Sequence, residues 1–177
     1  KVGDALDKEM LSAATKWACM EMLTSGTTTF YDILEAPNTL PGGLNTQKEE
    51  VMSAGIRGIL SFEATERSGT EKRHLGIEEN LSFHTETQDD PLISAMMCLH
   101  TTFTCSPEFI SHAFSLANQN NLAVHAHCNE GKYEGLWCEE NHGIRPLELY
   151  ETLGLANSNF IASQCVHLSK KEIEVIK

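Results

Sequence analysis

The chain has 177 residues, of which 41% are hydrophobic and 21% are charged, a composition typical of a soluble globular protein with a sizeable core. Its formal net charge of -12, with no run of basic residues, argues against nucleic-acid or anionic-membrane partners and favours a small-molecule substrate. No apolar run approaches the roughly 18 residues that a membrane span needs. Six cysteines without a C-x-x-C pair predict neither a disulfide framework nor a thiolate zinc site, a pattern typical of a cytoplasmic protein.

The two ends of the sequence lack the usual features of a complete protein. The chain begins at Lys1 without an initiating Met and stops at Lys177 in a helical pattern that has barely started. We therefore expect residues 1–177 to be part of a single domain that is truncated at both ends. We do not expect this segment to catalyse a reaction on its own.

The first third of the chain alternates between helical and strand patterns. Apolar residues recur at helical spacing between positions 6 and 20, and Gly26 is placed to end that helix. The β-branched and aromatic residues 27–32 predict a strand that closes on an acid, Asp32. Residues 45–54 predict a second helix with Asn45 as its N-cap, and residues 56–63 predict an apolar strand that ends at Glu63.

The middle of the chain continues the alternation. Residues 76–87 predict a weak helix, and residues 93–103 predict a strand with His100 near its end. Ser106 as an N-cap and Pro107 at the first helical position predict a helix that runs to about residue 120.

Residues 124–130 are the richest in chemistry, because a buried strand there ends in polar groups. Strand side chains alternate between faces, so His125 and His127 point the same way, and Glu130 follows three residues later. Imidazole is a common ligand of zinc or iron, and a nearby carboxylate can carry protons without binding the metal. A histidine on an apolar strand is more often a hydrogen-bonded core residue, and this interpretation suits His125 better than His127.

The last part of the chain adds a loop around Tyr133 and Trp137, a helix over residues 146–153 and a strand over residues 159–166. Ser169 forms a capping box with the glutamate three residues later, which predicts the start of a final helix.

Strand and helix thus alternate five times at intervals of roughly 30 residues, which predicts an α/β fold with a parallel sheet. The equal spacing favours a (β/α)8 TIM barrel over an open sheet, and no nucleotide-binding glycine motif opposes this. Polar residues at the strand ends should then face one mouth of the barrel: Asp32, Glu63, His100, His127, Glu130 and Gln164. For Asp32 and Glu63, a solvated acid that caps a loop is an equal alternative.

Four segments together resemble the amidohydrolase superfamily, and within it the aminohydrolases that deaminate adenosine-type, guanine, cytosine and chlorotriazine substrates. They are residues 25–32 (SGTTTFYD), 100–107 (HTTFTCSP), 125–130 (HAHCNE) and 165–168 (CVHL). Residues 62–67 (FEATER) and 76–80 (GIEEN) further resemble the branch called SsnA, which is linked to selenium metabolism.

The resemblance implies a (β/α)8 barrel of the metal-dependent hydrolase type, of which this chain holds about strands two to six. The family's first-strand His-x-His pair and its eighth-strand Asp would lie outside the sequence. By the same resemblance His127 is a ligand of one divalent metal ion, zinc or iron, Glu130 is the acid/base and His100 positions the substrate. The full-length protein is then expected to be a homo-oligomer.

The implied reaction is hydrolytic deamination of an amino-substituted heterocycle by a metal-activated water. A related C-N or C-Cl hydrolase and a catalytically silent barrel are the alternatives. The silent barrel is favoured by Gln164, since the family's sixth strand ends in Ala-His-Cys-Val-His and this chain reads SQCVH at residues 163–167. Glutamine can hydrogen-bond the attacking water as a catalytic residue, but it cannot titrate as imidazole does. The identity of the substrate stays open.

Overall fold

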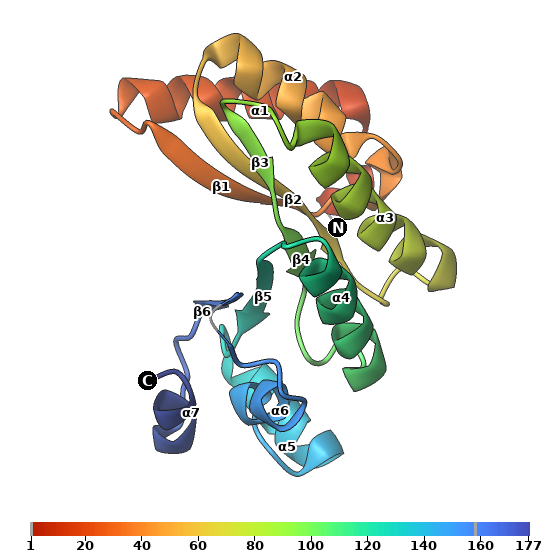
Figure 1. The fold of residues 1–177 in the computed structure, drawn as a ribbon, viewed down its shortest axis with the longest axis vertical. Coiled ribbons are helices and arrows are strands. Elements are labelled where there is room, and N and C mark those ends of the chain that lie inside the picture. Colours follow the sequence, from red (N-terminus) through yellow and green to blue (C-terminus); the bar gives the residue numbers. More distant parts are fainter. Residues whose placement is uncertain (1, 158) are drawn as a thin grey trace. The chain divides into compact units, whose positions relative to one another are not determined.

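The computed structural model describes residues 2–157 and 159–177. The chain, drawn as a ribbon in Figure 1, divides into two compact units. The first unit contains Lys1–Ala64 and Ser68–Cys98, and the second contains Thr65–Arg67 and Leu99–Lys177.

The first unit consists of helices packed on a parallel sheet. β1 pairs with β2 in parallel from Thr29↔Arg57 to Leu34↔Phe62, and β3 pairs with β2 in parallel at Gly58↔Ile93. The parallel pairing that the alternating pattern predicts is confirmed here. In chain order the elements are η1 (Gly3–Ala5), α1 (Lys8–Thr24), β1 (Thr29–Leu34), η2 (Pro37–Thr39), α2 (Gly43–Ala54), β2 (Arg57–Ala64), α3 (Thr70–Thr87), β3 (Ile93–Ala95) and β4 (Met97–Leu99), whose last residue belongs to the second unit.

The second unit repeats the strand and helix alternation. Its strands β5 and β6 are parallel, from Val124↔Phe160 to Cys128↔Gln164. The two strands therefore end side by side, and the residues that follow them share one edge of the pair. Its elements are α4 (Pro107–Gln119), β5 (Val124–Cys128), α5 (Lys132–His142), α6 (Pro146–Thr152), β6 (Phe160–Gln164) and α7 (Lys170–Val175).

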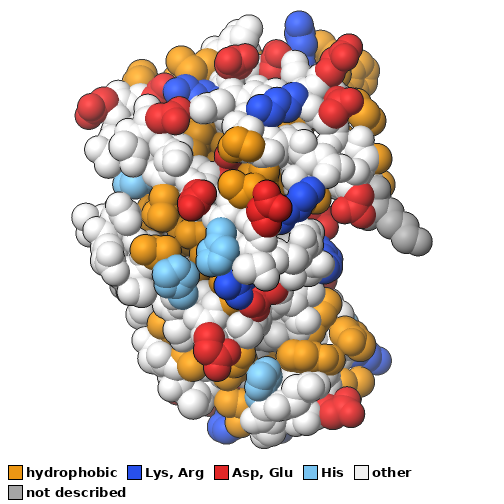
Figure 2. Space-filling view, turned by 90° about the vertical axis from the view of Figure 1, so that its right-hand side faces the viewer, with side chains coloured by type: hydrophobic (Ala, Val, Ile, Leu, Met, Phe, Trp, Pro, Cys, Tyr) orange, Lys and Arg blue, Asp and Glu red, His pale blue; other side chains and the backbone are white. Residues whose placement is uncertain are grey.

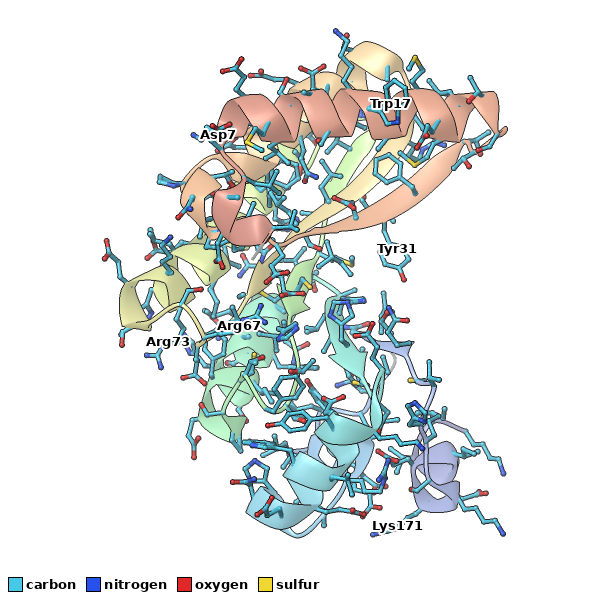
Figure 3. The ribbon with its side chains drawn as sticks, turned by 180° about the vertical axis from the view of Figure 1, so that it is seen from behind. Asp7, Trp17, Tyr31, Arg67, Arg73 and Lys171 are labelled. Carbon is cyan, nitrogen blue, oxygen red and sulfur yellow. The ribbon has the colours of Figure 1, made fainter. Side chains whose placement is uncertain are left out.

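Side-chain caps start three of the helices. Asp7, at the beginning of α1 (Figure 3), accepts a hydrogen bond from Met10 N. Ser106 accepts one from Phe109 N at the start of α4, and Ser169 forms the predicted capping box of α7. The two start signals read from Ser106 and Ser169 are confirmed, because a cap depends only on residues within one turn.

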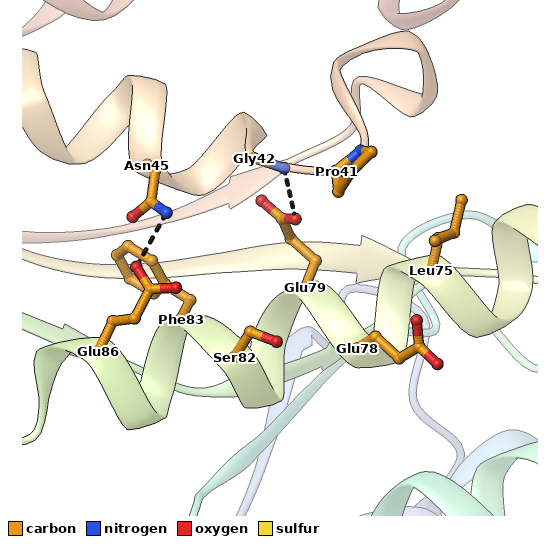
Figure 4. A pocket seen from close by; sticks show the side chains of 9 residues that line it. All are labelled: Pro41, Gly42, Asn45, Leu75, Glu78, Glu79, Ser82, Phe83 and Glu86. Carbon is orange, nitrogen blue, oxygen red and sulfur yellow. Dashed lines mark hydrogen bonds between the residues drawn. The ribbon is translucent and has the colours of Figure 1, made fainter.

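The predicted N-cap of α2 is wrong. Gly42, with φ of 92°, is the N-cap, so Asn45 lies inside the first turn of the helix. The Glu79 carboxylate from α3 caps this helix instead. It accepts a hydrogen bond from Gly42 N at 2.8 Å (Figure 4) and another from Leu44 N at 2.8 Å. A carboxylate is well placed there, because the first N–H groups of a helix lack partners and carry partial positive charge.

Replacing Glu79 by Ala is expected to destabilise the protein by about 2 kcal/mol, since it leaves two helix N–H groups without an acceptor. Glu78, the exposed neighbour on α3, provides the matched control. Urea unfolding of the two variants checks this prediction: Glu79→Ala should lower the midpoint and Glu78→Ala should not. Equal midpoints would show that the cap contributes nothing.

Apolar side chains of the helices cover the face of the first unit's sheet that bears Phe30, Leu34, Leu60 and Phe62. The core there includes Leu11, Cys19, Leu44, Val51 and Phe83 from α1, α2 and α3. Figure 1 shows α1 and α2 lying along the same side of β1 and β2.

Asp32 lies on this covered face, and its predicted place at a strand exit is wrong. β1 continues two residues beyond it, to Leu34. Residues two apart share a face, so Asp32 points the same way as Phe30 and Leu34, and its Oδ2 accepts a hydrogen bond from Gln47 Nε2 of α2 at 2.7 Å. Glu63 is the residue before the end of β2 and is buried.

Several elements differ from the predictions; for example, the strand expected over residues 159–166 is the shorter β6, which ends at Gln164. The strand expected over residues 93–103 breaks into β3 and β4 and ends at Leu99, and α3 begins at Thr70, before the expected residue 76. The loop expected around Tyr133 and Trp137 is helix α5. This helix has no side-chain N-cap and contains Gly135, so local signals are weak, and tertiary contacts of its buried Glu134 stabilise it.

The sequence predicts that neither a nucleic acid nor a membrane is a partner, and two structural features concern this prediction: surface charge and helix length. On the face drawn in Figure 2, Asp and Glu side chains are spread among Lys and Arg side chains, and the Lys and Arg side chains of this face form no large patch. Within residues 2–157 and 159–177, none of the helices is long and apolar enough to cross a membrane.

Candidate active site

β5 carries two histidines into a group of three imidazoles. His125 is fully buried, His127 is half-buried, and their ring centroids lie 5.2 Å apart. The ring of His100 lies 5.9 Å from that of His127, and His127 N donates a hydrogen bond to His100 O at 3.0 Å. The structure therefore brings together His100 and His127, which the sequence separates by a helix.

Burial keeps two of these imidazoles neutral. It lowers the pKa of His125 to about 4, with a smaller effect of the same sign from His127. Burial also lowers the pKa of His100 to about 4, and the nearby Arg67 and His127 lower it further. Both rings are uncharged near neutral pH, and the neutral form of imidazole is the one that can offer a nitrogen lone pair.

His100 is held by a turn rather than by a strand. Residues after β4 fold so that Thr104 N donates to Thr101 O at 3.1 Å, and His100 Nδ1 is 2.7 Å from Thr104 Oγ1. The Thr104 hydroxyl also accepts a hydrogen bond from Thr101 N at 3.3 Å, in place of the bond to a neighbouring strand that Thr101 N would make if the strand continued. The contact of His100 with Thr104 and the edge of Phe103, whose ring centroid is 5.7 Å away, fix the orientation of the His100 ring.

Glu130 lies where β5 ends. The strand ends at Cys128, because the next residue, Asn129, has φ of 53°, in the left-handed region. Glu130 follows, with an exposed side chain, before α5 begins at Lys132. A carboxylate in that place is accessible to a small molecule at the end of β5.

Gln164 lies beside the same exit, because it is the register partner of Cys128. It is the centre of a three-residue turn in which Cys165 N donates to Ser163 O at 2.9 Å, and its φ is 68°. The next residue, Cys165, also has positive φ, at 53°. Such backbone costs on the order of 1–3 kcal/mol per residue and is often found at functional sites.

The sequence alone does not reveal a cluster of four polar residues next to the ends of β5 and β6. Asn129, Glu134, Arg145 and Glu172 hydrogen-bond to one another or to the two turns. Glu172 was recognised only as part of a capping box. Its other partners lie 25 to 43 residues away in sequence, a separation at which no local pattern operates.

No group of three or more His, Cys, Asp or Glu side chains that could hold a metal ion occurs among the described residues. The chemistry of the donors that are present nevertheless suits a zinc ion. His127 is half-buried beside neutral imidazoles, and nitrogen ligands of this kind are common at zinc sites.

The sequence of this chain is similar to a family profile and to the sequences of several known enzymes. The sequence profile described as "Amidohydrolase family" matches residues 3–177. A 5'-deoxyadenosine deaminase of Methanococcus aeolicus is 34% identical over 175 residues, covering 97% of this chain and 39% of the relative. A 5-methylthioadenosine/S-adenosylhomocysteine deaminase 2 of Archaeoglobus fulgidus is 27% identical over 173 residues, covering 97% of this chain and 40% of the relative.

The structural comparison agrees with the sequence comparison. A crystal structure of an adenosine deaminase from Xanthomonas campestris with bound zinc superposes with a TM-score of 0.84 at 25% identity, over 97% of this chain and 38% of that chain. The predicted fold class, an α/β part of a (β/α)8 barrel of the metal-dependent hydrolase type, is thereby confirmed. The chain spans about two fifths of the length of these relatives.

Proposed function

Since this chain belongs to the amidohydrolase family, we propose that it carries part of the active site of a metal-dependent aminohydrolase. The reaction is the hydrolytic deamination of an amino-substituted heterocycle. The observation that carries this proposal is the ring contact between His100 and His127, with Glu130 exposed at the end of the same strand. The rest of the barrel, and the remaining metal ligands, would come from the complete protein.

Each of the four site residues has a role in this proposal. His127 would hold one divalent ion, zinc as in the adenosine deaminase structure, with iron as the alternative. When bound, such an ion lowers the pKa of water towards neutrality. Glu130 takes a proton from the attacking water and returns it to the ring nitrogen, while the water oxygen bonds to the ring carbon that bears the amino group. The second water proton then passes to the amino group, the carbon–nitrogen bond breaks with release of ammonia, and the ring carbon becomes a carbonyl. His100 hydrogen-bonds the substrate, and Gln164 orients the water.

The names of the relatives suggest the substrate class. Both curated relatives are deaminases of adenosine-type nucleosides that are altered at the 5' position. We therefore propose a 6-aminopurine nucleoside as the substrate of the complete protein. We also propose that residues 1–177 are part of one barrel domain, and that the complete protein is a cytoplasmic homo-oligomer that binds no nucleic acid or membrane.

The test of this proposal is an ammonia-release assay on the product of the complete reading frame that contains this sequence, here called the complete protein. The panel contains 5'-deoxyadenosine, 5'-methylthioadenosine, adenosine, guanine, cytosine and a chlorotriazine. Release of ammonia from at least one of the adenosine compounds is expected. Chloride release from the triazine without any ammonia would favour the C-Cl hydrolase, and no release at all would favour the silent barrel.

Gln164 is the feature that favours the silent barrel, and its replacement gives a second test. Gln164 can orient a water but provides no charged imidazole to stabilise developing negative charge, so activity should be reduced rather than absent. Gln164→His is expected to raise kcat by about 10- to 100-fold or to shift the pH profile. Gln164→Asn, which keeps an amide and tolerates positive φ, is the control.

If Gln164→His and Gln164→Asn show the same kcat and the same pH profile as the parent, Gln164 does not orient the attacking water.

A further inference from the structure

The turns after β5 and β6 are bonded to each other through their backbones. Cys165 N donates to Cys128 O and His167 N donates to Asn129 O, both at 2.9 Å. These two bonds place the segment that carries Gln164 directly beside the segment that carries Glu130. Three residues in these turns, Asn129, Gln164 and Cys165, have positive φ. The surroundings of Gln164 and Cys165 must therefore determine a conformation that these two residues themselves disfavour.

Arg145 joins both turns with one side chain. Its guanidinium donates to Asn129 Oδ1 at 2.9 Å, to His167 O at 2.7 Å and to Glu172 Oε2 at 2.6 Å. Space for this group is provided by Gly135, since a Cβ at that position would lie 2.6 Å from an Arg145 guanidinium nitrogen. A glycine inside a helix costs stability, so its presence in α5 is explained by the close approach of Arg145.

Glu172 completes the arrangement from α7. Its side chain is fully buried, and its carboxylate accepts from Asn129 Nδ2 at 2.8 Å, Ser169 N at 2.9 Å and Leu147 N at 3.2 Å, in addition to Arg145. Burial by itself raises the pKa of Glu172, but these hydrogen bonds outweigh burial and hold the pKa below its usual value. Glu172 therefore stays ionised and paired with Arg145.

Asn129 is at the centre of the group. Its side-chain amide binds both Arg145 and Glu172, and its backbone N donates to the buried Glu134 carboxylate. Glu134 in turn accepts from Thr102 N at 3.0 Å and Thr102 Oγ1 at 2.9 Å, in the turn that follows His100. Asn129, which lies between β5 and Glu130, thus has a hydrogen-bond partner for both polar atoms of its side chain.

We propose that Asn129, Arg145 and Glu172 form a positioning triad, which fixes Glu130 and Gln164 relative to each other at the ends of β5 and β6. This inference rests on the proposed function, in which these two side chains act on one water molecule. None of the triad residues is a catalytic residue itself. They act through the turns that they hold.

The energetics agree with a positioning role. A buried ion pair is an inefficient way to gain stability, because apolar residues of similar volume often serve as well or better. Its hydrogen bonds are directional, however, and can select one backbone geometry where no sheet ladder remains to do so. A misplacement of about 1 Å in a reacting group can lower a rate by roughly a hundredfold.

The test uses the complete protein with Arg145→Met, Arg145→Lys and Asn129→Gly. Asn129→Gly keeps a residue that accepts positive φ and removes only the side-chain bonds, so it remains informative if Arg145→Met fails to fold. The matched control is Lys171→Met, which removes the ion pair between the exposed Lys171 of α7 (Figure 3) and the buried Glu148 of α6 without touching either turn. Two quantities are measured: amide hydrogen exchange in residues 128–131 and 164–168, and kcat and KM for ammonia release.

In Arg145→Met and Asn129→Gly we expect faster exchange in both turns and a 10- to 100-fold lower kcat, with KM within about threefold of the parent. Arg145→Lys should recover part of kcat, and Lys171→Met should resemble the parent in both measurements. Unchanged exchange in the turns would overturn the triad, whatever the activity. Faster exchange with unchanged kcat would overturn its catalytic role. An inactive parent would instead overturn the proposed function, and with it the catalytic role, while exchange would still decide whether the triad orders the turns.

Discussion

Replacing Glu130 by Gln in the complete protein is expected to lower kcat for ammonia release by roughly a hundred- to ten-thousandfold, the usual contribution of a general acid/base. Glutamine has nearly the same shape as glutamate, but it can neither take a proton from water nor return that proton to the ring nitrogen of the substrate. KM should change little, because the substrate still meets the same surface. The measurement is steady-state ammonia release with the best substrate of the panel.

Glu140→Gln is the control for this substitution. Glu140 is another exposed glutamate, placed on α5, so the change in charge is identical and only the location differs. Its kcat should equal that of the parent. If Glu130→Gln retains more than about a tenth of the parental kcat, Glu130 does not carry the proton.

Replacing His127 by Ala is expected to remove most of the bound metal, because an imidazole ligand is lost from a site with few protein donors. The metal-to-protein ratio of the purified complete protein, measured by mass spectrometry of the elements, checks this. A parental ratio near one and a His127→Ala ratio close to zero are expected. Ammonia release should disappear together with the metal.

Two further histidines make this result specific. His125→Asn changes the fully buried neighbour on β5 and should keep the metal, since we assign His125 to packing rather than ligation. His112→Ala changes an exposed histidine on α4 and should have no effect. Loss of metal in His125→Asn with retention in His127→Ala would reverse the assignment of the two residues.

The parts of the site that could be predicted from the sequence depend on short-range patterns. The alternation of faces along a strand placed His125 and His127 on one side, and their rings do meet. Order along the chain placed β5 and β6 in parallel, so that Gln164 ends beside Cys128. The caps at Ser106 and Ser169 were recognised because each involves residues three apart.

The parts that could not be predicted depend on partners distant in sequence. Glu79 caps α2 from 35 to 37 residues away, and Glu172 reaches Asn129 across 43 residues. The position of Asp32 is hard to predict because a shift of two residues in the end of β1 decides whether an acid lies at a strand end or within the strand against a helix. The sequence predicts too long a strand around His100, because threonines are typical of strands and the sequence alone does not show that the hydroxyl contacts of Thr104 end the strand.

We propose that His127 holds a catalytic metal ion beside Glu130, and anomalous diffraction at the zinc edge from crystals of the complete protein tests this most directly. The predicted result is a single strong peak about 2.0–2.1 Å from a ring nitrogen of His127, the usual zinc–imidazole distance, with the Glu130 carboxylate within reach of a water at the same ion. A peak on a different set of residues, with the His127 ring uncoordinated, would contradict the account.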